Sequence, residues 1–166
     1  HARAGLEAIW THNPTSPRAK PALAALLPVS GKLDPTSSHG AALYESRIRT
    51  LERLFMNREA LVLREALAPT HPLREPHAFA GAVFKAKDYA RAADLLLALG
   101  DRGPKEGILL ALAQVRSGNA AACIQTYKRL AAGATTVAEL ATYKLGYMAF
   151  DQADWAGAIT AFDRYL

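Results

Sequence analysis

The residue types that could bind a metal or act as a general base are scattered along this chain. Two of its five histidines, His71 and His77, lie in a proline-rich stretch, APTHPLREPHAF. No cysteine or acidic residue accompanies them at the spacing of a metal site. The chain also lacks the glycine-rich phosphate loops and the Gly-x-Ser-x-Gly nucleophile motif. We therefore expect solvated loop histidines, and we predict no catalytic, metal or cofactor site in this chain.

The single cysteine and the carboxylates also have structural interpretations. Cys123 occupies a position of a predicted helix where a small residue faces the core. This position predicts a buried and unreactive thiol. Four glutamates alternate with arginines in residues 41–67, as ion pairs on a solvated helix face would. These glutamates are Glu45, Glu52, Glu59 and Glu65.

Basic and aromatic residues provide a candidate binding surface. It consists of Arg47, Arg49, Arg53, Lys85, Lys87, Tyr143 and Tyr147. The cations could form a groove for an anionic polymer, and ordinary surface charge is the alternative. The tyrosines could stack on sugars or peptides, or pack half-buried between helices. Nucleic acid is not expected as the partner, because glutamates interrupt the basic stretch and no aromatic ladder accompanies it.

Composition predicts one folded, all-α chain. Of the 166 residues, 51% are hydrophobic, and Ala and Leu dominate among them, which favours helices over strands. The net charge of +5 would assist an encounter with a polyanion. No apolar run reaches the roughly 18 to 20 residues of a membrane span. Because the chain begins without Met or a signal sequence, we expect a mature or excised piece of a longer protein.

Short polar turns recur along the chain, and each interval between two turns is long enough for a pair of helices. Residues 87–89, 118–120 and 153–155 form three such turns, whose centres lie 31 and 35 residues apart. This spacing brackets the period of about 34 residues of tetratricopeptide repeats. A small residue follows each turn, and a larger one comes four positions later. The small residues are Ala92, Cys123 and Ala158, and the larger ones are Leu96, Tyr127 and Phe162.

The repeat divides the chain into an N-terminal helix pair with a loop, residues 1–40, and four helical repeats in residues 41–166. The repeats cover about 41–72, 73–104, 105–137 and 138–166, and a loop is expected over residues 28–40. In the last repeat, Gly146 and Ala158 are predicted to face each other across a close helix pair, with Trp155 at the turn and Phe162 one helical turn further on. Stacked hairpins of this kind predict a right-handed α-solenoid that is one continuous superhelix.

The last repeat, with Leu145-Gly146, Asp154-Trp155, Ala158 and Phe162, resembles a tetratricopeptide repeat. More specifically, several segments resemble the α-superhelical region of periplasmic soluble lytic transglycosylases. These segments are GLEAIWTHNPTSPRAKPALAAL, SRIRTLERLFMNREALVLREAL, AGAVFKAKDYARAADLL and ATYKLGYMAFDQADWAGAITAFDRYL.

In that family the superhelix flanks a lysozyme-like domain that cleaves peptidoglycan by means of one acidic residue. The acidic residue belongs to a Glu-Ser pair that is followed by Gly-Leu-Met-Gln. Here Glu45-Ser46 lies within a predicted repeat helix, and no Gly-Leu-Met-Gln follows. The resemblance therefore implies a non-catalytic scaffold of a cell-envelope enzyme, located in the periplasm or envelope of a bacterium and binding peptidoglycan or a protein. A stand-alone tetratricopeptide-type adaptor for a peptide or protein is the alternative, and a cytoplasmic location stays open with it.

Overall fold

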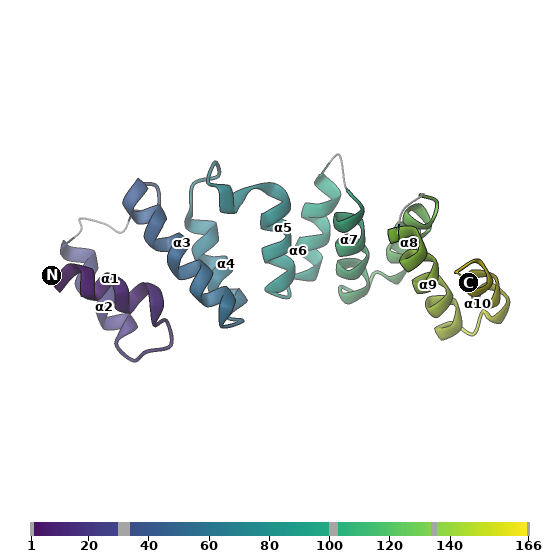
Figure 1. Cartoon of the computed structure of the whole chain (residues 1–166), viewed down its shortest axis with the longest axis horizontal. Helices are drawn as coiled ribbons and strands as arrows, with labels where there is room; N and C mark the ends of the chain where they lie inside the picture. Colours follow the sequence, from purple (N-terminus) through teal and green to yellow (C-terminus); the bar gives the residue numbers. More distant parts are fainter. Residues whose placement is uncertain (1, 30–33, 100–102, 134–135, 166) are drawn as a thin grey trace. The chain divides into compact units, whose positions relative to one another are not determined.

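The computed structural model describes residues 2–29, 34–99, 103–133 and 136–165, and over these residues the chain is all-α, with helices and turns but no strand (Figure 1). This result agrees with the composition, because Ala and Leu have high helix propensity. The helices of the described residues are α1 (Ala2–His12), α2 (Ala19–Val29), α3 (Ser38–Arg53), α4 (Asn57–Ala66), the 3-10 helix η1 (Pro72–Arg74), α5 (Pro76–Lys85), α6 (Tyr89–Ala98), α7 (Pro104–Arg116), α8 (Ala120–Ala131), α9 (Thr136–Asp151) and α10 (Trp155–Tyr165).

The chain divides into two compact units, His1–Lys87 and Asp88–Leu166. In the first unit, α1 packs against both α2 and α3. Trp10 and Leu26 form a buried cluster there, and Leu43 and Tyr44 of α3 pack against it. The predicted N-terminal segment, residues 1–40, therefore shares its core with the residues that follow it.

The predicted loop over residues 28–40 is shorter than expected at both ends. Helix α2 continues to Val29, and α3 already begins at Ser38. Helix α3 begins there because the Ser37 side chain accepts a hydrogen bond from the Gly40 N–H at 3.1 Å, as an N-cap residue does. Residues 30–33 of the predicted loop lie outside the described residues.

The α3–α4 hairpin holds the second cluster of the first unit. Ile48 and Leu51 of α3 meet Ala60 of α4 and Leu67 behind it. Ala60 stands five positions after Phe55, as Ala92 stands after Lys87, and it is buried. Helix α5 then packs against α4.

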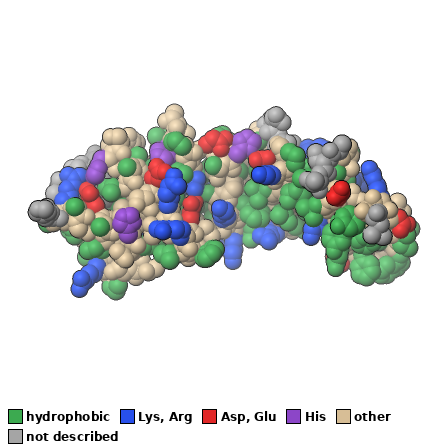
Figure 2. All heavy atoms as spheres, in the orientation of Figure 1, with side chains coloured by type: hydrophobic (Ala, Val, Ile, Leu, Met, Phe, Trp, Pro, Cys, Tyr) green, Lys and Arg blue, Asp and Glu red, His purple; other side chains and the backbone are tan. Residues whose placement is uncertain are grey.

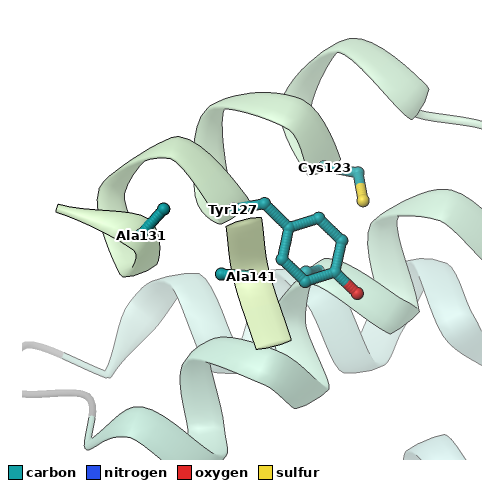
Figure 3. Packing of buried hydrophobic residues seen from close by; sticks show 5 residues of the cluster. Cys123, Tyr127, Ala131 and Ala141 are labelled. Carbon is teal, nitrogen blue, oxygen red and sulfur yellow. The ribbon is translucent and has the colours of Figure 1, made fainter. Parts of the chain in front are cut away.

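In the second unit, neighbouring helices pack in chain order from α6 to α10. The cluster at the centre of this unit is built from α7, α8 and α9, and it contains Cys123, Tyr127 and Ala141. Figure 3 shows the ring of Tyr127 close to Ala141, with Cys123 one helical turn away on the same helix. Small residues therefore surround one large ring, which allows the helices to approach closely.

Four turns of the chain share one backbone geometry. In each turn, a residue just after the end of a helix has a positive φ: Phe55 (58°), Lys87 (67°), Gly118 (87°) and Ala153 (58°). At three of the turns, the next residue donates its N–H to a carbonyl five positions back, the bond that ends a helix in a Schellman motif. These bonds are Met56 to Leu51, Asn119 to Gln114 and Asp154 to Ala149, at 2.9, 2.8 and 2.9 Å.

The residue after each of these positive-φ positions is the N-cap of the next helix. Asp88, Asn119 and Asp154 each accept a hydrogen bond from the N–H three residues later, at 3.4, 3.2 and 3.0 Å. Met56 stands at the same place before α4 and makes no side-chain cap. The turn before α4 thus keeps the backbone of the others but not their cap.

Candidate functional site

Two of the three candidate arginines of α3 make polar contacts within the protein. The guanidinium of Arg47 donates to the backbone carbonyl of Trp10 and lies 4.8 Å from the centre of its ring. Burial lowers the pKa of Arg47. Arg49 donates from Nε to Glu45 at 3.0 Å, and this hydrogen bond raises the pKa of Arg49. Arg47 therefore joins α3 to α1, and Arg49 pairs along the surface of its own helix.

Arg53, the third, lies in an open hollow of about 600 Å³ between α1 and α3, which we call the arginine hollow. Its Nη2 donates to Thr50 Oγ1 at 3.3 Å. The arginine hollow is lined by His12, Ser46, Arg49, Thr50, Glu52 and Arg53. Here the structure brings together Arg49 and Arg53, which the sequence singles out, and His12, which it does not.

Lys85 and Lys87 lie in a second hollow, of about 440 Å³, which we call the turn hollow. It lies between the α3–α4 turn and the end of α5, two places separated by almost one repeat in the sequence. It is lined by Phe55, Met56, Asn57, Arg58, Glu59, Lys85, Ala86 and Lys87. The sequence reasoning missed Phe55 as a surface residue. Its alignment with Lys87, Gly118 and Ala153 at the turn position was the available signal.

Tyr143 and Tyr147 belong to an aromatic cluster of α9 and α10. The ring of Tyr143 lies 5.5 Å from Tyr147, 5.4 Å from Tyr165 and 6.0 Å from Phe162. Tyr143 is half-buried, whereas Tyr147 is 52% exposed. The two tyrosines therefore differ. Tyr143 packs between helices, whereas Tyr147 presents its ring to solvent.

The residues predicted to pack the repeats lie in several environments. Ala92, Cys123 and Ala158 are buried. Gly146 faces Phe162, because a Cβ at Gly146 would come within 2.7 Å of the Phe162 ring. Trp155 is 57% exposed and meets Phe150 edge-on at 5.1 Å. Trp155 therefore lies on the surface of the α9–α10 hairpin, with its ring against Phe150 of α9.

Exposed apolar side chains gather on the same hairpin. Figure 2 shows hydrophobic side chains over the region of α9 and α10, in contrast to the mixed charges over α3. The exposed apolar residues of this hairpin are Leu140, Tyr147, Phe150, Trp155, Ile159 and Tyr165. Such a concentration is typical of a protein interface more than of an ordinary surface.

Two expectations about polar residues hold only in part. His77 is exposed, as expected. His71 is not solvated: its side chain is 15% exposed, and Nδ1 accepts from the Leu73 N–H at 3.1 Å, which caps η1. Glu52 forms an ion pair as expected and its side chain is 28% exposed, but its partner does not lie on a solvated face. The Glu52 carboxylate accepts from Arg64, whose side chain is only 7% exposed and also donates to the Leu73 carbonyl at 2.7 Å. The fold buries Arg64 because η1 folds back over α4.

The thiol of Cys123 and the carboxylate of Glu45 are two other groups that could take part in chemistry. Burial raises the pKa of the Cys123 thiol, which lies 4.0 Å from the sulfur of Met148. Glu45, of the Glu-Ser pair, pairs with Arg49 and lies 3.9 Å from His71 Nε2. Within the residues that the structure describes, no group of three or more His, Cys, Asp or Glu side chains could hold a metal ion. None of the helices in that part of the chain has both the length and the apolar character of a membrane span.

Comparison of the chain with models of protein families, with curated proteins and with solved structures finds no match.

Proposed function

We propose that this chain is a non-catalytic helical-repeat scaffold of a bacterial cell-envelope peptidoglycan lytic transglycosylase, and that it supports the binding of peptidoglycan or of a partner protein. In this proposal the helix pairs stack as a right-handed α-solenoid in the periplasm or envelope. The resemblance of several segments to the superhelical region of those enzymes is one support. The observation that carries the proposal is the repeated turn geometry of Phe55, Lys87, Gly118 and Ala153.

That geometry supports a repeat protein because it is local and recurs at nearly constant spacing. The four positive-φ residues lie 32, 31 and 35 residues apart in sequence. Each follows one helix and precedes the next, so every period supplies a pair of helices. A helix pair cannot bury its apolar face alone, and stacking on a neighbour is the usual solution.

The surroundings of Glu45 support a scaffold rather than a catalytic role for this residue. A catalytic acid of a glycosidase needs a raised pKa in a dry pocket. The carboxylate of Glu45 instead accepts hydrogen bonds from Arg49 on the next turn of α3, in a partly exposed position. Such a carboxylate stabilises a helix surface.

Co-sedimentation with purified peptidoglycan sacculi tests the peptidoglycan part of this proposal. The chain is expected to pellet with sacculi in a saturable manner at physiological salt, and to stay in the supernatant with cellulose. The basic side chains of the two hollows would contribute, so binding should weaken as the salt concentration rises. A chain that stays in the supernatant at every sacculus concentration would contradict direct contact with peptidoglycan.

The alternative is a tetratricopeptide-type adaptor for a protein partner, and the exposed apolar residues of α9 and α10 favour it. The double variant Trp155→Ala, Ile159→Ala removes two of these side chains without touching the buried cluster of α7, α8 and α9. If the adaptor function holds, a defined partner captured by the parent chain is lost by this variant, whereas sedimentation with sacculi is absent in both. If the chain binds peptidoglycan as a scaffold, both proteins sediment with sacculi.

A further inference from the structure

The turn hollow is an open, positively charged depression on the surface of the first unit. Its two walls are the α3–α4 turn and the end of α5, and Arg58 Nε donates to the Ala86 carbonyl across it at 3.4 Å. The hollow contains three basic side chains and one acidic one, so its net charge is positive. These residues are Arg58, Lys85, Lys87 and Glu59.

The two lysines of the turn hollow are available to a ligand. Both are exposed, and among the described residues neither has a carboxylate within ion-pair distance. By contrast, three arginines of the same unit are engaged by a carbonyl or a carboxylate, namely Arg47, Arg49 and Arg64. The unpaired ammonium groups favour an anion in this hollow.

Phe55 gives the hollow an aromatic wall. Its side chain is 86% exposed, the most of any large apolar residue in the described part of the chain. Its φ of 58° is a conformation in which glycine would be more stable, and Gly118 occupies the equivalent place in another repeat. A phenyl ring there neither fills the core nor suits the turn. This combination favours a ring that serves a surface contact.

We propose that the turn hollow binds a peptide-bearing sugar of a glycan, with the apolar face of the sugar on Phe55 and a carboxylate of the attached peptide at Lys85 and Lys87. Asn57 and Glu59 line the same hollow and offer amide and carboxylate groups to sugar hydroxyls or to an acetamido N–H. This assignment rests on the proposed function, because peptidoglycan supplies a sugar that carries a peptide with free carboxylates.

The side chains of the hollow favour such a saccharide over a nucleic acid. Single strands are usually bound by several aromatic rings along a basic groove. Here one ring stands beside two lysines, and the Glu59 carboxylate would repel a phosphate backbone while it can accept from a hydroxyl. A nucleic acid is therefore one of the outcomes that the experiment separates.

Two glycine substitutions test the site without damaging the fold. Phe55→Gly and Lys87→Gly each remove an exposed side chain from a positive-φ position, where glycine has no steric penalty. Ala153→Gly is the matched control, because it makes the same backbone change at φ 58° in the α9–α10 turn. All three variants are expected to melt at or above the temperature of the parent chain, so that any loss of binding comes from the lost side chain.

Binding is measured by NMR titration of the whole chain with a disaccharide–tetrapeptide muropeptide, with neutral chitotetraose and with a single-stranded oligonucleotide. The muropeptide should shift the resonances of residues 55–59 and 85–87, and chitotetraose should bind more weakly. Lys87→Gly should weaken muropeptide binding by about tenfold, the order of a charge-assisted hydrogen bond. Phe55→Gly should weaken it by roughly fivefold through lost ring contact. Ala153→Gly should bind like the parent.

The outcomes separate this site from the proposed function. If the parent sediments with sacculi but both glycine variants bind muropeptide as the parent does, the turn hollow is not the site and the scaffold proposal stands. If the parent does not sediment with sacculi, the peptidoglycan part of the proposed function fails, and the assignment of the turn hollow, which rests on it, fails with it. A tighter oligonucleotide complex that depends on Lys87 would overturn the saccharide assignment in favour of nucleic acid.

Discussion

The α3–α4 and α9–α10 hairpins share a turn and differ in almost everything attached to it. Phe55 and Ala153 have the same φ of 58°, and the backbone bonds from Met56 to Leu51 and from Asp154 to Ala149 are both 2.9 Å long. The side chain at the positive-φ position is an exposed phenyl ring in one hairpin and a methyl group in the other. The turn geometry therefore does not depend on the side chain that occupies it.

The two hairpins are also held together by different interactions. In α3–α4, Arg64 joins Glu52 across the pair and also contacts Leu73. In α9–α10, the contacts are made by rings, with Phe162 against Gly146 and Tyr143. The two hairpins thus share the backbone geometry of the turn while their packing differs.

The largest expected effect comes from the ion pair of the first hairpin, in which the arginine is buried. Glu52→Ala should lower the free energy of unfolding by about 3 kcal/mol, because it leaves the Arg64 guanidinium buried without a carboxylate. The Nε of Arg64 already has no hydrogen-bond partner among the described residues. Urea denaturation monitored by circular dichroism measures the change. Glu45→Ala, at an exposed pair, is the control and should cost much less.

Small residues at the same place in both hairpins should resist enlargement. Ala60→Leu and Ala158→Leu should each lower the free energy of unfolding by about 1 to 3 kcal/mol, because both alanines are buried between helices. Thermal and urea unfolding measure the loss. Ala156→Leu is the control, since Ala156 is exposed on the same helix as Ala158. Equal stability of the Ala158→Leu and Ala156→Leu variants would contradict close packing at Ala158.

The shared turn can be tested by exchanging residues at its positive-φ position. Ala153→Gly should raise the free energy of unfolding by about 1 kcal/mol, and Gly118→Ala should lower it by a similar amount. The reason is that an L-residue with a Cβ is strained at positive φ, whereas glycine is not. Differential scanning calorimetry measures both shifts. A stabilising Gly118→Ala would show that this turn does not keep a positive φ.

The smallest effect concerns the missing cap of the first hairpin. Met56→Asp should stabilise the chain by about 0.5 kcal/mol, because a carboxylate at this place can accept from the first N–H groups of α4. Met56 also packs partly against the α3–α4 cluster, which limits the gain. Asp154→Ala, which removes an existing cap, should destabilise by about 1 kcal/mol. Chemical denaturation of both variants, side by side, checks that the signs are opposite.

Helix type and turn position are local properties, and the sequence alone determined them. Ala- and Leu-rich stretches predict the helices, and polar turns such as those at residues 118–120 and 153–155 separate them where the structure has turns. The small residues that follow the turns could be picked out by the same spacing. These features depend on neighbouring residues within a few positions along the chain.

Only the tertiary structure decided which distant side chains meet. Nothing local indicates that Arg64 is buried under η1 or that Arg47 lies on Trp10. The turn hollow, too, arises because α4 and α5 pack so that Phe55 comes beside Lys85 and Lys87. Such contacts depend on the angle between helices and on side-chain rotamers, which the pattern of a single helix does not specify.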